Sequence, residues 1–374
     1  MLSQIVGIIK GNYSPLNIIE VSSNNIRHNY QYLSSIDKSI KIAPVLKSNA
    51  YGHDIKIIGK EVDKLKPPFI CVDSLYEAYE LQKANIKSPI LIMGYVAPLS
   101  LKTKPLPFSF AVYTKEIVDA LASYQPQAKV HIFVDTGMHR EGIDVSELAD
   151  FVKYVKEQKL FIEGLMSHFA MADKPNHILT KSQVDKFQES QKIMSTLKVI
   201  PIWIHIANSS GILNAERYKG KLGNLARTGL ALYGIDPMGK NRNVKPTLIL
   251  KTHIEQIKTI KAGESIGYDF TFVAKRNMRI AILPIGYHDG VDRRLSNKGY
   301  VSYKAKILPI VGRISMNITT VDVTNVNVAV GTMITIYSND CLSENSIQNS
   351  ARMCNMIPYE LLIHLTSSTK RVVI

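Results

Sequence analysis

The sequence predicts an α/β protein, a TIM-like (β/α)8 barrel followed by an all-β C-terminal domain. Two observations support this prediction. Eight short apolar runs alternate with amphipathic segments over about 230 residues, as the buried strands and outer helices of a parallel barrel do. After Pro246 the helical segments give way to strand-like runs joined by turns.

The barrel elements follow one another in a regular order. A lead-in strand at residues 16–21 precedes a Ser-Ser-Asn-Asn cap and a helix reaching about Leu33. The pattern predicts barrel strands at residues 41–47, 69–73, 90–94, 109–113, 129–135, 162–168, 202–207 and 225–234. It predicts helices at residues 74–83, 114–123, 145–158 and 181–197. An open doubly wound sheet is the alternative, but no glycine-rich dinucleotide turn follows the first strand.

The second domain is predicted from residue 241 to the C-terminus. Its strands are expected at residues 248–259, 278–284, 300–310, 311–323, 332–337 and 370–374. Residues 239–243 are the predicted junction. We therefore expect a barrel over residues 12–240, with residues 241–374 and an N-terminal strand in residues 1–11 forming the β domain.

Composition limits the class of protein. The chain has 374 residues, of which 45% are hydrophobic and 21% charged, as in a soluble globular protein of two domains. Its apolar runs are strand-length, which argues against a membrane protein, and its first ten residues lack the pattern of a secretory signal. The three cysteines have no metal or redox spacing, which predicts a cytoplasmic protein without a metal site.

The net charge of +15 raises the question of nucleic-acid binding. The lysines are scattered singly, and no zinc-finger or aromatic RNA-binding motif accompanies them. We therefore expect no nucleic-acid partner. A basic surface would still attract small anionic substrates or a phosphorylated cofactor.

Polar residues gather at the predicted C-terminal ends of the barrel strands, where such barrels carry their chemistry. Each has a plain alternative. Lys47 fits a lysine extending to solvent, and His168 a hydrogen-bonded core histidine. Asn208 with Ser209 fits a helix cap, and Arg227 half of a buried ion pair. Their occurrence on one predicted rim favours a shared site.

These residues have complementary chemistry. The Lys47 amine could condense with an aldehyde, most readily if it is partly desolvated. Ser209 and the backbone amides of Gly229 and Leu230 could receive a phosphate, and Arg227 could donate to a ring nitrogen. An aldehyde, a phosphate and a ring nitrogen together indicate pyridoxal 5'-phosphate (PLP).

The chain resembles the alanine racemases, PLP enzymes built from a barrel and a C-terminal β domain. The resemblance covers nearly the full length. It rests on nine runs in order: KSNAYGH (47–53), VDTGMHR (134–140), HFA (168–170), HIANS (205–209), RTGLALYG (227–234), GY (267–268), PIGYHDG (284–290), GRISM (312–316) and PYE (358–360).

The resemblance implies roles for individual residues. Lys47 matches the Schiff-base lysine and one catalytic base, and Tyr268, supplied by the partner subunit, matches the other base. His168 matches a residue of the tyrosine–arginine network, and Arg227 the partner of the ring nitrogen. The remaining cofactor-side positions are Tyr51, Asn208, Ser209, Gly229, Leu230 and Tyr359. The positions on the substrate side are Arg140, Met316 and Tyr287, the last on the access path.

Racemisation removes a proton from one face of Cα and returns one to the other, so a base is needed on each side. A site shared between chains would make a homodimer obligatory. The resemblance thus implies a cytoplasmic alanine racemase supplying D-alanine for peptidoglycan. Without the resemblance, Tyr268 would more readily be interpreted as a core aromatic residue of a β domain.

Two positions depart from the family pattern. Phe133 stands where many members have a carbamylated lysine, whose negative charge lies beside the arginine that matches Arg140. Arg140 would then need another neutraliser, such as a bound anion, the Glu141 carboxylate or more solvent. Asn317 stands where an aspartate is usual near the substrate carboxylate.

Three alternatives remain open. A racemase of broader range could act on serine, lysine or arginine. A decarboxylase of the same barrel type would normally have a carboxylate, not Arg227, at the ring nitrogen. A non-catalytic PLP-binding protein would normally lack the domain that carries Tyr268.

Overall fold

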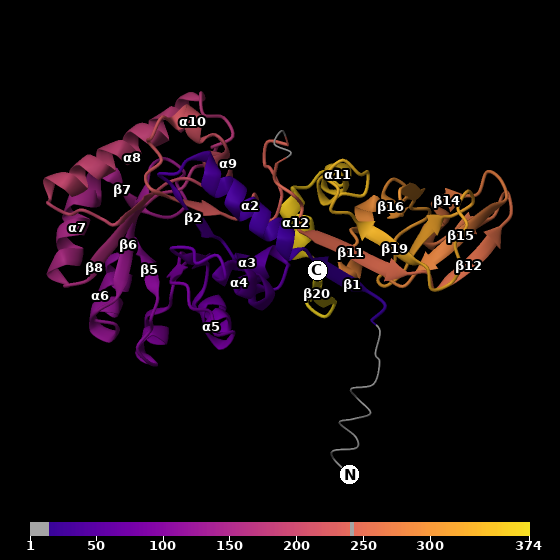
Figure 1. Cartoon of the computed structure of the whole chain (residues 1–374), viewed down its shortest axis with the longest axis horizontal. Helices are drawn as coiled ribbons and strands as arrows, with labels where there is room; N and C mark the ends of the chain where they lie inside the picture. The colour runs from indigo at the N-terminus through magenta and orange to yellow at the C-terminus, as the bar shows by residue number, and fades with distance from the viewer. Residues whose placement is uncertain (1–14, 240–242) are drawn as a thin grey trace, which may run out of the picture. The chain divides into compact units, whose positions relative to one another are not determined.

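The computed structural model describes residues 15–239 and 243–374 (Figure 1). The chain divides into two compact units. We call residues 23–247 the barrel unit, and residues 15–22 together with 248–374 the β unit. The strand predicted in residues 1–11, and the domain boundaries predicted at residues 12 and 240, lie outside the described residues.

Eight parallel strands, in chain order, form the ring of the barrel unit within its described residues. They are β2 (Lys41–Pro44), β3 (Ile70–Val72), β4 (Ile90–Ile92), β5 (Ser109–Val112), β6 (Lys129–Asp135), β8 (Phe161–Met166), β9 (Trp203–His205) and β10 (Leu225–Thr228). Strands β3 to β9 form one sheet, which β7 (Ile143–Asp144) joins at β6, while β10 pairs with β2. A bridge from Val45 to Cys71 links β2 to β3, and the Arg227 N–H donates to the Ala207 carbonyl at 3.0 Å. These links close the ring and confirm the predicted barrel.

Helices cover the outside of this ring (Figure 1). Helix α6, for example, turns an apolar stripe inward with Ile117, Val118 and Leu121. A capping box between Ser74 and Glu77 begins α5. The helices are α2 (Ser23–Ile36), α3 (Lys47–Tyr51), α4 (Ile55–Asp63), α5 (Leu75–Lys83), α6 (Lys115–Tyr124), α7 (Leu148–Glu157), α8 (Ile178–Thr196), α9 (Ser209–Leu213) and α10 (Ala215–Tyr218), with 3-10 turns η1 (Pro98–Lys102) and η2 (Val145–Glu147).

Two barrel strands end three or more residues before their predicted C-terminal residues. The strand predicted at 225–234 ends at Thr228, because the residues after it form successive turns, with the Leu232 N–H donating to the Gly229 carbonyl. The strand predicted at 41–47 ends at Pro44, and Lys47 already begins α3. Both differences place backbone turns where the sequence suggested continued strand.

The β unit is built around a six-stranded sheet in the order β17-β16-β19-β11-β1-β20. Its strands are β1 (Ile18–Val21), β11 (Leu248–His253), β16 (Tyr300–Tyr303), β17 (Lys306–Pro309), β19 (Met333–Tyr337) and β20 (Lys370–Val373). Burial alternates along β11, which gives the sheet one covered face. Strand β1 pairs with β11 and β20, so residues 18–21 belong to this sheet.

Smaller elements complete the β unit. A three-stranded sheet contains β12 (Gln256–Ile260), β15 (Met278–Leu283) and β18 (Thr319–Asp322), and a two-stranded sheet contains β13 (Ser265–Ile266) and β14 (Phe272–Val273). The predicted strand at 248–259 is therefore two strands, β11 and β12. Short helices not expected from the sequence are α11 (Ile347–Met353), α12 (Pro358–Ile363), η3 (Tyr268–Phe270), η4 (Tyr287–Asp289) and η5 (Arg293–Leu295).

Two classes of feature are absent from the part of the chain that the structure describes. None of its helices has both the length and the apolar character that crossing a bilayer requires. Within the same residues, no group of three His, Cys, Asp or Glu side chains could hold a metal ion.

Candidate active site

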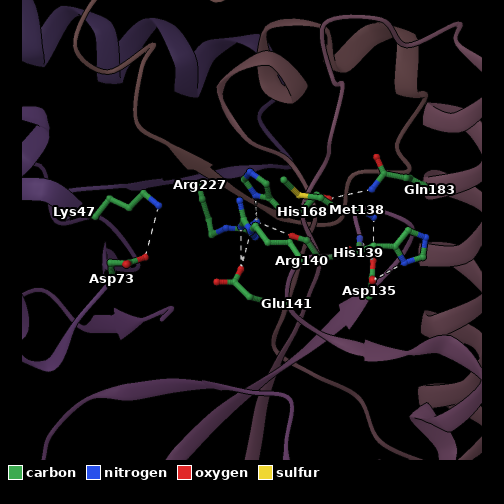
Figure 2. A network of polar contacts seen from close by, with 11 residues as sticks. Lys47, Asp73, Asp135, Met138, His139, Arg140, Glu141, His168, Gln183 and Arg227 are labelled. Carbon is green, nitrogen blue, oxygen red and sulfur yellow. Dashed lines mark hydrogen bonds and ion pairs between the residues drawn. The ribbon is translucent and has the colours of Figure 1, made fainter. Parts of the chain in front are cut away.

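Lys47 follows the first barrel strand, and its Nζ lies 3.6 Å from a carboxylate oxygen of Asp73 (Figure 2). Its side chain is 37% exposed. The side chain is therefore partly buried, as expected, and it extends past the strand end to an acidic partner. The lysine is accessible to a ligand on this rim.

A left-handed turn fixes the backbone after Lys47. Residues 48–51 all have φ between 51° and 54°, a conformation that costs L-residues roughly 1–2 kcal/mol each. Side chains stabilise the turn. Glu77 Oε1 accepts from the Ser48 N–H at 2.6 Å, and Asn49 Oδ1 accepts from the Ile55 N–H at 2.9 Å. Such strain, held by its surroundings, is characteristic of functional sites.

Tyr51, at the end of this turn, lies against the backbone that follows β10. A Cβ placed on Gly229 would be 2.5 Å from the Tyr51 hydroxyl, so only glycine permits this approach. No described residue accepts a hydrogen bond from the backbone N–H of Gly229 or Leu230. The Ser209 hydroxyl accepts from the Ala231 N–H at 3.2 Å and keeps its own proton for another acceptor. These donors suit a phosphate group.

Asn208 has a local structural role. Its Oδ1 accepts from the Gly211 N–H at 3.0 Å, which caps α9. The structure therefore confirms the helix-cap alternative for the Asn208 side chain. By capping α9, Asn208 also fixes the position of Ser209, the first residue of that helix.

Arg227 lies inside the barrel and is 4% exposed. Its Nη1 donates to Nδ1 of His205 at 2.5 Å and to the His205 carbonyl at 3.2 Å. Its Nη2 donates to the Ser167 carbonyl at 2.6 Å and to Nδ1 of His168 at 3.0 Å. Burial lowers the pKa of Arg227 to about 10, which leaves it charged at neutral pH. The described residues provide no acceptor for its Nε–H, so this donor remains for a ligand.

His168 is held between cations. Burial, with the positive charges of Arg227, Arg140 and Lys47, keeps the pKa of His168 well below its ordinary value. The ring is therefore neutral, and because its Nδ1 accepts from Arg227, its proton is on Nε2 (Figure 2). His168 can thus donate a hydrogen bond to a group that approaches from the far side of the ring.

Arg140 resolves one of the two departures from the family pattern. Its Nε and Nη2 lie 3.0 and 2.9 Å from Oε2 of Glu141 (Figure 2). Phe133 is buried against Met166 and Tyr113, and lines a small open pocket with Arg140, Glu141 and His168. Of the neutralisers considered, the structure provides the Glu141 carboxylate. Asp135 shapes this loop by accepting from three backbone N–H groups at 2.8 to 3.2 Å.

The remaining predicted site residues lie in the β unit. Tyr268 is 66% exposed, and the next residue, Asp269, has φ 57° and an ion pair with Arg313 at 3.0 Å. Tyr287 and Met316 lie close together, because the Tyr287 and His288 N–H groups donate to the carbonyls of Ser315 and Met316. Asn317 follows Met316 at the surface, and Tyr359 is in the first turn of α12.

Two buried residues next to this site were not predicted. His131 and Glu163 lie inside β6 and β8 and connect to Arg227 through His205. Their signal in the sequence is a polar residue within each of two otherwise apolar strand patterns. A buried polar side chain requires a hydrogen-bond partner, so each of these residues indicates a polar contact inside the barrel.

A barrel whose strand ends assemble a lysine, a donor-rich turn and a buried arginine defines an enzyme of the PLP-barrel class. Comparison with known proteins agrees. The alanine racemase N-terminal domain profile matches residues 21–237, and the C-terminal domain profile matches residues 247–373. The chain therefore belongs to the alanine racemase family, whose members are isomerases.

Individual relatives cover the whole architecture. "Alanine racemase 1" of Caldanaerobacter subterraneus subsp. tengcongensis is 34% identical over 95% of this chain and 94% of its own length. The Bacillus anthracis alanine racemase structure with bound L-Ala-P is 30% identical, with TM-score 0.87, over 97% of this chain and 96% of that one. The Bartonella henselae enzyme, solved with covalently bound pyridoxal phosphate, is 26% identical, with TM-score 0.83, over 96% of this chain and all of that one.

Proposed function

We propose that this protein interconverts L- and D-alanine with PLP as cofactor, by a mechanism that uses two bases. The observation that carries the proposal is the placement of Lys47, His168 and Arg227 around one barrel rim, in a chain that belongs to the alanine racemase family. In this role the protein would provide D-alanine for peptidoglycan in the cytoplasm.

The barrel residues fit the cofactor. The Lys47 amine would hold its aldehyde carbon, and the Tyr51 and Ser209 hydroxyls with the free amides of Gly229 and Leu230 would hold its phosphate. The unused Nε–H of Arg227 would donate to the ring nitrogen and keep that nitrogen unprotonated. When bound, PLP acidifies the Cα–H of an attached amino acid by delocalising the resulting negative charge.

The two bases would be Lys47 and Tyr268. Lys47 would carry the Cα proton on one face, and the Tyr268 hydroxyl of the partner subunit would carry it on the other. The exposure of Tyr268, together with the 73% exposure of Phe270 beside it, supports a role in which a second chain covers them. The Nε2–H of His168 could then orient the tyrosine oxygen.

Arg140 would bind the substrate carboxylate, with the Met316 backbone on the same side and Tyr287 along the access path. Glu141 would balance the charge of Arg140 without a carbamylated lysine at position 133. This arrangement, with Asn317 replacing the usual aspartate, favours one alternative function, a racemase that also accepts longer or polar amino acids.

The proposal is tested with purified, PLP-loaded protein. L-alanine should be converted to an equal mixture of L and D forms, followed by chiral chromatography, and faster than serine, lysine or arginine. Lys47→Ala should lose both the visible absorbance of the bound cofactor and at least 10³-fold in rate, whereas Lys56→Ala, a surface lysine paired with Glu80, should lose neither. Retained absorbance in Lys47→Ala would contradict the assignment.

A further inference from the structure

A continuous row of buried polar side chains extends from Arg227 into the barrel interior. His205 Nδ1 contacts Arg227, and His205 Nε2 lies 2.8 Å from His131 Nδ1. His131 Nε2 lies 3.3 Å from Glu163 Oε2, which Ser109 also contacts at 2.6 Å. His131 and His205 are 0% exposed, and Arg227 and Glu163 are 4% exposed. We call Glu163, His131 and His205 the relay.

Only one arrangement of protons satisfies every bond of the relay. Arg227 can only donate, so Nδ1 of His205 accepts and the His205 proton is on Nε2. That proton is donated to Nδ1 of His131, whose own proton is therefore on Nε2 and points at Glu163. An ionised carboxylate can only accept, so the row ends at a group that matches its direction.

The protonation states agree with this arrangement. Burial, with the charge of Arg227, keeps the pKa of His205 well below its ordinary value, and burial likewise lowers the pKa of His131. Although burial opposes it, hydrogen bonds from His131 and Ser109 lower the pKa of Glu163 to about 2. Two neutral rings therefore separate a buried cation from a buried anion.

The backbone leaves room for the relay at one glycine. A Cβ on Gly164 would lie 2.2 Å from Nδ1 of His131, the atom that accepts from His205. Phe69 packs edge-on against the same ring at 5.2 Å. The His131 ring is therefore held by packing as well as by hydrogen bonds, as positioning groups around a functional residue are.

We propose that Glu163 and His131 are positioning residues that fix His205 and, through it, the orientation of the Arg227 guanidinium. In this orientation Nη1 and Nη2 are fully used by protein acceptors, and Nε–H alone is presented to the cofactor's ring nitrogen. The inference rests on the proposed function, because it gives the relay a purpose only if Arg227 meets that ring.

The first test uses the full-length, cofactor-free protein labelled with 15N-histidine. Long-range 1H–15N spectra at pH 7.5 should show His131 and His205 as neutral rings protonated on Nε2. A ring protonated on Nδ1, or a charged ring at either position, would overturn the relay. The spectrum does not depend on racemisation, so its failure is distinguishable from failure of the proposed function.

The second test uses two variants that leave Arg227 and His205 in place. Glu163→Gln keeps an acceptor for His131 but removes the charge, and Gly164→Ala displaces the His131 ring sterically. Each should lower kcat for alanine about tenfold, with KM changed less than about twofold, and Glu163→Gln should shift the 15N signals of His205. A loss of about tenfold is typical when a residue that orients a functional side chain from behind is replaced.

Glu163 also pairs with Lys129, at 3.1 Å. Glu20→Gln is the matched control, because Glu20 likewise pairs with a lysine, Lys251 at 2.7 Å, but in the β unit. It should leave kcat and the histidine signals unchanged. Relay variants that fold yet keep kcat within twofold of the unaltered protein, or an unmoved His205 signal in Glu163→Gln, would overturn the positioning role. If both variants fail to fold, the spectrum of the unaltered protein still decides the proton arrangement.

Discussion

The two units hold their candidate site residues in opposite ways. In the barrel unit, Arg227 and the relay are buried, and their contacts come from the same unit. In the β unit, Tyr268, Met316 and Tyr287 are 66%, 55% and 43% exposed. Folding of one chain therefore fixes the barrel residues through buried hydrogen bonds. The β-unit residues instead have exposed side chains. A function that needs both sets of residues would combine a buried, preassembled set with an exposed one.

The largest contrast is expected in stability. Arg227→Met removes four hydrogen bonds and leaves buried acceptors unpaired, which should lower the free energy of unfolding by about 1–3 kcal/mol. Tyr268→Phe changes an exposed side chain and should alter it by less than about 0.5 kcal/mol. Urea unfolding of the cofactor-free protein, followed by the fluorescence of Trp203, the single tryptophan, measures both. Equal losses would contradict the contrast between the units.

The buried titratable residues of the barrel unit should also make the stability of the protein depend on pH. Burial keeps the pKa values of His131 and His205 below their ordinary value, so below about pH 6.5 the unfolded chain takes up protons that the folded barrel does not. The free energy of unfolding should therefore fall on acidification, by at most roughly 1.4 kcal/mol per pH unit for each histidine. Because Glu163 has a pKa of about 2 in the folded state, its contribution is present above its ordinary value of 4.5 and is lost between 4.5 and 2.

Trp203 fluorescence again provides the measurement, since this residue lies in β9 of the barrel unit. The urea midpoint should be lower at pH 5.5 than at pH 7.5. In a double variant, His131→Asn with His205→Asn, the urea midpoints at pH 5.5 and pH 7.5 should differ by less than in the unaltered protein. A midpoint that is the same at both pH values in the unaltered protein would contradict the burial of neutral histidines.

The smallest effect is expected at Arg140. Glu141→Gln removes the negative charge beside Arg140, so a substrate carboxylate would bind to a less neutralised guanidinium. Because exposed ion pairs contribute about 0.2–1 kcal/mol, KM for alanine should fall by no more than about fivefold. Chloride should then compete more strongly with alanine. Glu61→Gln, at a surface pair with Lys64, is the control, and a raised KM in Glu141→Gln would contradict the role of Glu141.

The barrel and much of its rim could be predicted because both follow from local pattern. Apolar runs marked the strands, and strand ends marked Lys47, His168 and Arg227. The relay could not be predicted in the same way, because His131 and Glu163 are single polar residues in apolar runs and meet only when β6, β8 and β9 are neighbours. The exposure of Lys47 and the turns after Thr228 depend on backbone geometry, which hydrophobic periodicity does not report.

In the proposed enzyme, the buried barrel residues of one chain and the exposed β-unit residues of its partner would form one active site. A shared site is tested by mixing Lys47→Ala with Tyr268→Phe, each expected to be inactive alone, and allowing the subunits to exchange. In a homodimer with shared sites, half of the dimers are mixed and each has one complete site, so about a quarter of the unaltered activity should return. If mixed dimers isolated by two affinity tags show no recovery, a site shared between two chains is contradicted.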